Sequence, residues 1–343
     1  MKSTTICRNQ MTIACWCALL AALPATAQEP VVPEALRESV LKDPAKAKPQ
    51  GLANSLSVGS TGAFNHSNSV VGASDGGTVA LGLVLEGASE WVSGGIESLN
   101  TLKIQHTQTR TPQIPAFFKS ADFAELVSTT LYRLTAMPWL GPYARVRATT
   151  QLFANEVIKA APYEVKSTRL DGSTSTLSLA AQTRHRLSGA LNPLVLSETL
   201  GAFANPIERK TFTLKAKLGV GALQVLADEG FAVTADDPKA SRLEVKQIQP
   251  ATQIGAEAEV ALAGDVTEGV AWKAKANVFL PAYSTQGQKT GVAAMNADLG
   301  FAVSAKLAKW LSLDYAVSAR RVPLVLDAWQ VMHGVMVTAG FKM

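Results

Sequence analysis

The final stretch of the chain, Trp329–Phe341, alternates between two kinds of side chain. One set of alternate positions is mostly apolar and includes Val331 and Val335. The other set is small and mixed in character and includes Gly334 and Thr338. A period of two residues is that of a β-strand whose two faces meet different surroundings. The C-terminal stretch is therefore predicted to be a two-faced strand that ends on an aromatic residue.

The same patterning recurs along the chain and predicts about twelve strands after residue 53. The clearest segments place an apolar row opposite a row of Lys, Arg or amide side chains, as in 143–155, 211–226 and 269–281. The predicted strands are 54–64, 78–87, 96–108, 120–136, 143–155, 191–204, 211–226, 244–263, 269–281, 292–307, 311–320 and 328–342.

Two architectures fit such strands. In a soluble sandwich the apolar faces pack on a partner sheet, whereas in a membrane barrel they face lipid and the polar faces line the lumen. The connections favour the barrel, because short ones (88–95, 264–268) alternate with longer ones (109–119, 156–190). The prediction is an all-β, transmembrane, antiparallel up-and-down β-barrel of about twelve strands.

The longest connection, 156–190, contains a hairpin signal of its own. Asp171-Gly172 lies between two strand-like segments, 163–170 and 173–179. We interpret it as an extracellular hairpin. The alternative is that both segments cross the membrane, which would give fourteen strands.

The N-terminus predicts export. Lys2 and Arg8 precede an apolar segment, 11–23, and Ala25-Thr26-Ala27 forms a small-x-small cleavage site. The domains are thus a cleavable signal peptide (1–27), a periplasmic linker (28–53) and an outer-membrane barrel (54–343). All three cysteines lie in the signal segment, at positions 7, 15 and 17, so disulfides and thiolate sites are not expected in the mature chain.

The net charge of the chain does not indicate a nucleic-acid partner. Removal of Lys2 and Arg8 leaves 30 of the 32 Lys and Arg residues against 27 Asp and Glu, a net charge of +3. The mature chain has no basic run, so no nucleic-acid partner is expected.

Aromatic residues cluster where the short connections are predicted. Amphipathic rings are favoured at the head-group level of a membrane, so these residues are candidates for an interfacial girdle. The candidates are Trp91, Trp139, Tyr143, Phe203, Trp310 and Phe341, with Phe153, Tyr283 and Trp329 marking the other rim.

Charged residues on the polar faces are candidates for a lumen charge ladder. If Val266 is the centre of a hairpin, Glu259 faces Lys273 and Glu257 faces Lys275. A turn centred on Trp310 would similarly place Lys306 opposite Asp314. The ladder candidates are Arg145, Arg147, Lys215, Lys217, Glu257, Glu259, Lys273, Lys275, Lys306 and Asp314.

The sequence offers little reaction chemistry. The four histidines lie far apart, and no paired metal-ligand spacing, nucleophile motif or phosphate-binding loop occurs, so neither metal nor cofactor is expected. His333 falls on the apolar face of the last strand, where an ionisable group is costly. A nucleophile would have to come from the first strand, which carries Ser55, Ser57 and Ser60.

Several strings also resemble a family of bacterial outer-membrane β-barrels known only as a domain of unknown function. They are LNPL at 191–194, ETLGAFANP at 198–206, KLGVGALQ at 217–224, KWLSLDY at 309–315 and DAWQV at 327–331. The resemblance covers roughly the last 150 residues. It implies an outer-membrane barrel and brings no catalytic residues with it.

We therefore expect a non-enzymatic, porin-like barrel in the outer membrane of a Gram-negative cell, acting as a passive pore for small solutes. The alternative is a structural or surface-interaction barrel whose lumen is filled by side chains. An outer-membrane lipid hydrolase is the third reading. The expected partners are outer-membrane lipid and the barrel-assembly machinery, which would recognise the C-terminal strand; the oligomeric state is left open.

Overall fold

The structure is a computed structural model that describes residues 50–67, 76–209, 211–237, 241–285, 290–308, 311–324 and 326–342. The predicted signal peptide, its cleavage site, the three cysteines and nearly all of the linker lie outside these residues. So does Trp310 of the predicted girdle.

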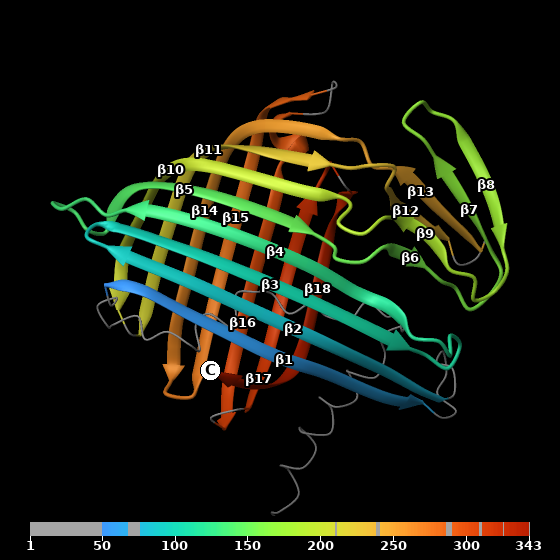
Figure 1. Cartoon of the computed structure of the whole chain (residues 1–343), viewed down its shortest axis with the longest axis horizontal. Helices are drawn as coiled ribbons and strands as arrows, with labels where there is room; N and C mark the ends of the chain where they lie inside the picture. Colours follow the sequence, from blue (N-terminus) through green and yellow to red (C-terminus); the bar gives the residue numbers. More distant parts are fainter. Residues whose placement is uncertain are drawn as a thin grey trace, which may run out of the picture.

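Twelve antiparallel strands close into one barrel (Figure 1). β1 pairs with β18, placing Val58 opposite Phe341, so the C-terminal strand closes the sheet as its position and pattern predicted. Closure removes the unpaired edges that an open sheet would expose. The strands are β1 (Gly51–Ser67), β2 (Gly76–Ser93), β3 (Ile96–Arg110), β4 (Phe118–Tyr132), β5 (Leu140–Thr150), β10 (Leu194–Arg209), β11 (Phe212–Leu226), β14 (Ala251–Thr267), β15 (Val270–Ser284), β16 (Asn296–Ala308), β17 (Leu311–Val322) and β18 (Leu326–Lys342).

The predicted fold class is confirmed, with each of the twelve predicted barrel strands present. The fourteen-strand alternative is wrong, because the hairpin at Asp171-Gly172 belongs to a separate sheet. One predicted strand, 244–263, is in fact two: β13 (Arg242–Gln247) lies outside the barrel, and β14 begins only after Pro250. Proline has no backbone N–H to donate to a sheet, which accounts for the break.

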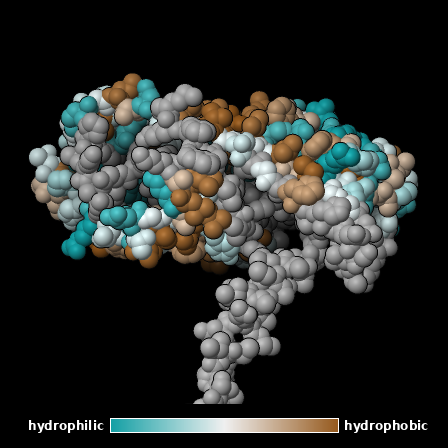
Figure 2. All heavy atoms as spheres, turned by 90° about the horizontal axis from the view of Figure 1, so that it is seen from below, coloured by the Kyte–Doolittle hydropathy of each residue, from teal (hydrophilic) through white to brown (hydrophobic). Residues whose placement is uncertain are grey.

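The two faces of the barrel differ in exposure. Leu200, Leu218 and Val220 point outward and are 65%, 66% and 66% exposed, so no part of the described chain covers them. Figure 2 shows apolar residues along the middle of the molecule and hydrophilic residues gathered toward its ends. Inward-facing side chains such as Lys103 and Glu125 are instead buried. The alternation seen in the sequence thus separates an apolar outer wall from a polar interior.

The connections also differ at the two ends of the barrel. One end has turns such as 94–95 and 268–269, and the other carries the long segments 151–193 and 227–250. We call these the turn end and the loop end. The predicted asymmetry in connection length is therefore present.

The two longest loop-end segments fold together into what we call the cap module. It contains a four-stranded sheet in the order β12-β13-β7-β8 and a two-stranded sheet of β6 and β9 (Figure 1). Its strands are β6 (Asn155–Val157), β7 (Tyr163–Thr168), β8 (Thr174–Leu179), β9 (His185–Ser188), β12 (Phe231–Asp237) and β13 (Arg242–Gln247). Tyr163, Val165, Leu187, Leu243 and Val245 form its buried core.

The cap module shows where the sequence prediction was incomplete. The β7–β8 hairpin was predicted, and Gly172 adopts φ +82° in its turn. No strand was predicted between 226 and 244, yet this connection contains β12 and the start of β13. The β7–β13 pairing is parallel and joins residues 78 positions apart in sequence, such as Arg242 and Glu164, so local pattern could not reveal it. Among the described residues, no helix is long and apolar enough to span a membrane.

Candidate functional site: a lumen charge network and a loop-end rim pocket

A network of charged side chains lies inside the barrel between β5 and β14. Arg145 on β5 donates from Nη1 to Oε2 of Glu259 at 2.6 Å and also pairs through Nη2 with Glu257. The side chains of Arg145, Glu257 and Glu259 are 3%, 5% and 9% exposed. Two carboxylates and a guanidinium buried so deeply require one another, because an unpaired buried charge is costly.

Further partners complete this network. Lys217 lies directly opposite Glu259 and donates to its Oε1 at 2.9 Å, and Lys275 approaches Oε2 at 3.6 Å. Asn277 donates to Glu257 at 2.6 Å, and the Thr199 hydroxyl donates to the same carboxylate. We call these seven residues the lumen network: Arg145, Thr199, Lys217, Glu257, Glu259, Lys275 and Asn277.

Glycines let Arg145 reach across the lumen. β5 and β14 are separated by β10 and β11, so the two strands lie roughly 14 Å apart along the wall. Between them, Gly201 is paired with Gly219 and Gly221 with Gly255. A Cβ at Gly219 would lie 2.5 Å from the Leu200 carbonyl oxygen. The wall therefore curves tightly here, and the missing side chains leave room for the Arg145 side chain.

Five residues of the predicted ladder, Arg145, Lys217, Glu257, Glu259 and Lys275, come together in the lumen network. The predicted register between β14 and β15, however, was wrong. The hairpin turns at Glu268-Gly269 rather than at Val266. Glu259 is therefore opposite Asn277, and Glu257 is opposite Phe279. Lys273 and Lys275 are opposite Ala263 and Ala261, so Lys275 reaches Glu259 only diagonally.

The second predicted pair is also displaced. Because of a bulge between Lys306 and Ala308, Lys306 lies opposite Ser312, and Asp314 lies opposite Ser304. Asp314 instead accepts hydrogen bonds from the hydroxyls of Ser304, at 2.5 Å, and Ser312, at 2.9 Å. Lys215 faces inward but is exposed, near the turn end.

A second charged row, which the sequence analysis missed, lines the β2–β5 wall. Glu86 lies opposite Lys103 with 3.9 Å between the charged atoms, and Lys103 lies opposite Glu125. Arg147, a predicted lumen residue, is 3.6 Å from Glu125. The signal was present in the sequence, since polar residues Lys103, Gln105, Thr107 and Thr109 alternate along β3.

The aromatic girdle needs two corrections. Trp91 and Trp139 are 42% and 45% exposed at the turn end. Tyr143 and Phe203, predicted to join them, point into the barrel and are 4% and 1% exposed. Both lie on the same face of their strands as Arg145 and Thr199, so two-residue periodicity assigns them to the lumen. The side chain of Phe341 lies outside the described set.

The residues considered for catalysis are not neighbours in the sheet. In the β1–β18 pairing, Ser60 is opposite Ala339 and Ser57 is opposite Lys342. These positions are six and nine residues from His333, or roughly 20–30 Å along the strand. His333 instead pairs with Val317 of β17. Among the described residues, no cluster of three or more His, Cys, Asp or Glu side chains could hold a metal ion.

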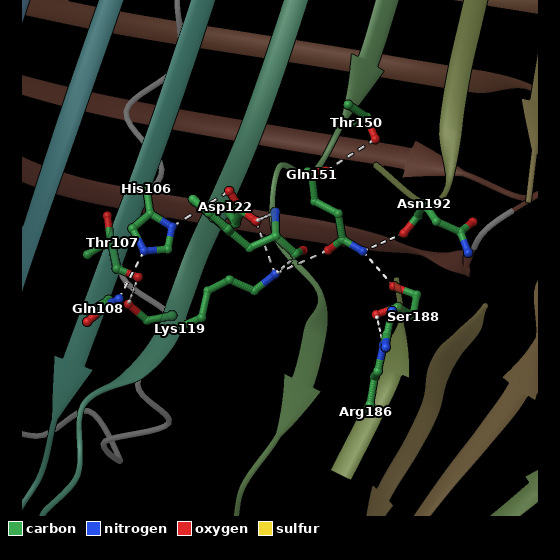
Figure 3. A network of polar contacts seen from close by, with 12 residues as sticks. His106, Thr107, Gln108, Lys119, Asp122, Thr150, Gln151, Arg186, Ser188 and Asn192 are labelled. Atoms are coloured by element: carbon green, nitrogen blue, oxygen red, sulfur yellow. Dashed lines mark hydrogen bonds and ion pairs between the residues drawn. The ribbon is translucent and has the colours of Figure 1, made fainter. Parts of the chain in front are cut away.

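At the loop end, a second set of polar contacts ties the barrel to the cap module (Figure 3). Gln151, just after β5, donates to the Ser188 hydroxyl at 2.6 Å and to the Asn192 carbonyl at 2.5 Å. Lys119 of β4 bonds to Asp122 at 3.2 Å and to Gln151 at 3.5 Å. The loop between β9 and β10 is thus fixed to the barrel rim by side chains.

This loop borders a pocket of about 790 Å³, which we call the rim pocket. Its apolar lining includes Leu191, Leu194, Leu226 and Phe231. Its charged lining is Arg186, Asp228 and Glu229. The Asn192 side-chain amide also makes two hydrogen bonds to the backbone of Asp228. Its Oδ1 accepts from the Asp228 N–H at 3.2 Å, and its Nδ2 donates to the Asp228 carbonyl. The two loops that form the pocket are therefore joined to each other.

Comparison with known proteins finds similarity among solved structures only. No family model matches the sequence, and no curated protein is similar to it in sequence. Among solved structures, an outer-membrane channel from Pseudomonas putida F1 is 10% identical, with a TM-score of 0.40, over 87% of this chain and 96% of the channel. The translocator domain of the autotransporter NalP from Neisseria meningitidis is 10% identical, with a TM-score of 0.36, over 87% and 90%. The channel DcaP of Acinetobacter baumannii is 8% identical, with a TM-score of 0.32, over 87% and 99%.

Proposed function

We propose that this protein is an outer-membrane β-barrel with a side-chain-filled lumen that anchors the cap module on the outside of the cell. The apolar outer wall, the sheet closure and the long-loop end support the membrane placement. Under it, the turn end faces the periplasm and the cap module faces the exterior. Of the three functions considered from the sequence, this is the second, since an open pore was expected first.

The observation that carries the proposal is the lumen network. Arg145 reaches from β5 to the two glutamates on β14, and all three side chains are almost fully buried. Small inward residues on another wall, Ala302 and Ala316, are also buried, at 0% and 5% exposure. In an open, water-filled channel such inward-facing side chains would be exposed to solvent. The buried charges thus favour a closed barrel over a diffusion pore.

Conductance in a planar bilayer tests this function. The purified wild-type protein is expected to give no stable open level. A triple variant, Arg145→Ala with Glu257→Ala and Glu259→Ala, removes the bridge together with both of its carboxylates and should produce measurable conductance. Lys215→Ala serves as the control, because Lys215 is exposed near the turn end, away from the bridge. A persistent open level in the wild-type protein would contradict the closed-lumen function.

A second function, a gated pore, is favoured by the polarity of the interior. Lys103, Gln105, Thr107 and Glu125 are polar and face inward on β3 and β4. A conducting state would need the lumen network to separate. In the double variant Arg145→Cys, Glu257→Cys the two thiols are too far apart for a direct disulfide, so a thiol-reactive cross-linker with a reducible bond would be used to join β5 to β14. Voltage-dependent opening of the wild-type protein that is abolished in the cross-linked double variant, and restored when the linker is cleaved by reduction, would select this function over the anchor.

A further inference from the structure

The rim pocket opens on the outer surface of the barrel. Leu194 and Leu226 are opposite each other on β10 and β11. Each lies six residues from an outward-facing position, Leu200 and Val220 respectively, so two-residue periodicity places both leucines on the outer face. Leu226 is 47% exposed and Leu191 57% exposed. The apolar lining is therefore continuous with the wall that faces lipid.

The pocket lies at the head-group level of that wall. Glu198 is exposed and points outward between Leu200 and Leu194. A carboxylate at this position is unfavourable in hydrocarbon, so the apolar layer ends near Glu198. Leu194 and Leu226 lie beyond it, toward the cap module. A molecule in the pocket would have its polar part among head groups and its apolar part against the barrel.

The charges around the pocket are of both signs and have no ion-pair partner among the described residues. Arg186 donates to the Ser188 carbonyl, at 3.3 Å, and neither Asp228 nor Glu229 contacts a cation of the described chain. Elsewhere in the cap module, opposite charges do pair, as Lys159 does with Asp236 and Arg184 with Glu156. One guanidinium and two carboxylates around one cavity complement a head that carries both an anion and a cation.

The backbone around the pocket is held in an unusual conformation. Leu191 and Glu229 have φ values of +57° and +47°, which non-glycine residues rarely adopt. Such residues cost free energy and persist where the surrounding contacts enforce them, commonly at ligand sites. Here the contacts are those of Gln151 and Asn192 described above, and Figure 3 shows Gln151 pointing toward Ser188 and Asn192. The pocket is thus pre-formed rather than a gap between loose loops.

From these observations we propose that the rim pocket binds one amphipathic lipid with a zwitterionic aminoalkyl-phosphate head. Arg186 would contact the phosphate and Asp228 with Glu229 the ammonium group, while the first chain carbons would lie on Leu194 and Leu226. Charge-assisted contacts to both ends of the head give selectivity against a purely anionic lipid, which Asp228 and Glu229 would repel. The proposal rests on the membrane placement proposed above but not on the closed lumen.

Native mass spectrometry of the delipidated, full-length protein in detergent micelles tests the site. Phosphatidylethanolamine added to the micelles is expected to bind one to one, and added phosphatidylglycerol with the same chains to bind at least tenfold more weakly. Asp228→Asn combined with Glu229→Gln should remove this difference, whereas Arg186→Gln should weaken the binding of both lipids, because both carry the phosphate. Asp171→Asn is the matched control, because Asp171 is an exposed acid of the same module at the β7–β8 turn.

Two further comparisons separate the contributions. Leu226→Trp should fill the pocket and weaken lipid binding, whereas Leu218→Trp, outward on the same strand, should not. Equal retention of both lipids by wild-type protein, or equal loss in Leu218→Trp, would mean ordinary annular lipid and would overturn the proposal. Equal binding of free phosphoethanolamine would assign the pocket to a soluble zwitterion instead of a lipid. A barrel that inserts into vesicles yet binds neither would contradict this site and leave the membrane placement intact.

Discussion

At the scale of single residues, inward glycines determine how the interior is filled. Gly201, Gly219 and Gly255 face the lumen where a Cβ would meet backbone oxygens of the next strand at 2.1–2.5 Å. Backbone atoms in a sheet cannot move aside as the end of a flexible side chain can. These positions therefore allow the curvature that brings Arg145 to Glu257 and Glu259.

Gly219→Ala is expected to destabilise the barrel by about 1–3 kcal/mol, because the added methyl group would overlap the Leu200 carbonyl oxygen. Gly300→Ala is the control: Gly300 lies on the inward face of β16 and has no atom within 4 Å of an added Cβ. Reversible urea unfolding in lipid vesicles measures both changes. Equal effects of the two substitutions would show that the close approach at Gly219 has no energetic consequence.

At the scale of elements, the cap module is a small folded unit with its own titratable groups. Burial raises the pKa of Tyr163 in its core. Hydrogen bonds from Ser173 lower the pKa of Asp171 at the hairpin turn. Burial also lowers the pKa of His185, on β9 opposite Val157, below its ordinary value of 6.5. His185 is therefore neutral in the folded module near pH 7.

The module should lose stability as the pH falls. The unfolded segment binds a proton to His185 more readily than the folded one, so the stabilisation is complete above about pH 6.5. It declines as the pH falls from 6.5 through the lowered pKa of folded His185. Hydrogen exchange of β6 and β9 amides at pH 7.5 and 5.5 measures this, and His185→Gln should flatten the dependence. An unchanged dependence in that variant would show that other groups cause it.

At the scale of the whole molecule, the exposed outer wall decides what surrounds the barrel. Leu200 lies opposite both Ala144 and Val220, and the described chain leaves this band uncovered. Exposed apolar bands of this extent are unfavourable in water, and burial in lipid removes them from it.

Leu218→Arg should therefore cost about 2–4 kcal/mol, because Leu218 lies four residues from Ala222, the residue opposite Glu198, and so lies deeper in the apolar layer. Leu218→Met, which keeps the surface apolar, should cost less than about 1.5 kcal/mol. Folding into vesicles, followed through heat-modifiable gel migration and urea titration, gives both values. An arginine tolerated as well as the methionine would mean that water, not lipid, covers Leu218.

The sequence by itself determined the strands of the barrel and the class of fold. Two-residue alternation in segments such as 211–226 and 269–281 reports two different environments, and the aromatic last strand indicated closure. Faces could be assigned wherever polar and apolar residues alternate, and Lys217, Glu257 and Glu259 were placed in the lumen on that basis. The hairpin at Asp171-Gly172 could also be predicted from local sequence, because its turn needs a residue that tolerates positive φ, as Gly172 does.

Only the tertiary structure decided which charges meet. A bulge and a shift of the turn from Val266 to Glu268-Gly269 moved Lys273 away from Glu259, and alternation is insensitive to any shift by an even number of residues. Arg145 meets the glutamates across two intervening strands, a contact set by wall curvature. Tyr143 and Phe203 were misassigned because an aromatic near a turn suits either an interface or a packed interior. The rim pocket depends on two loops, one before β10 and one after β11, that are brought side by side by the pairing of these strands.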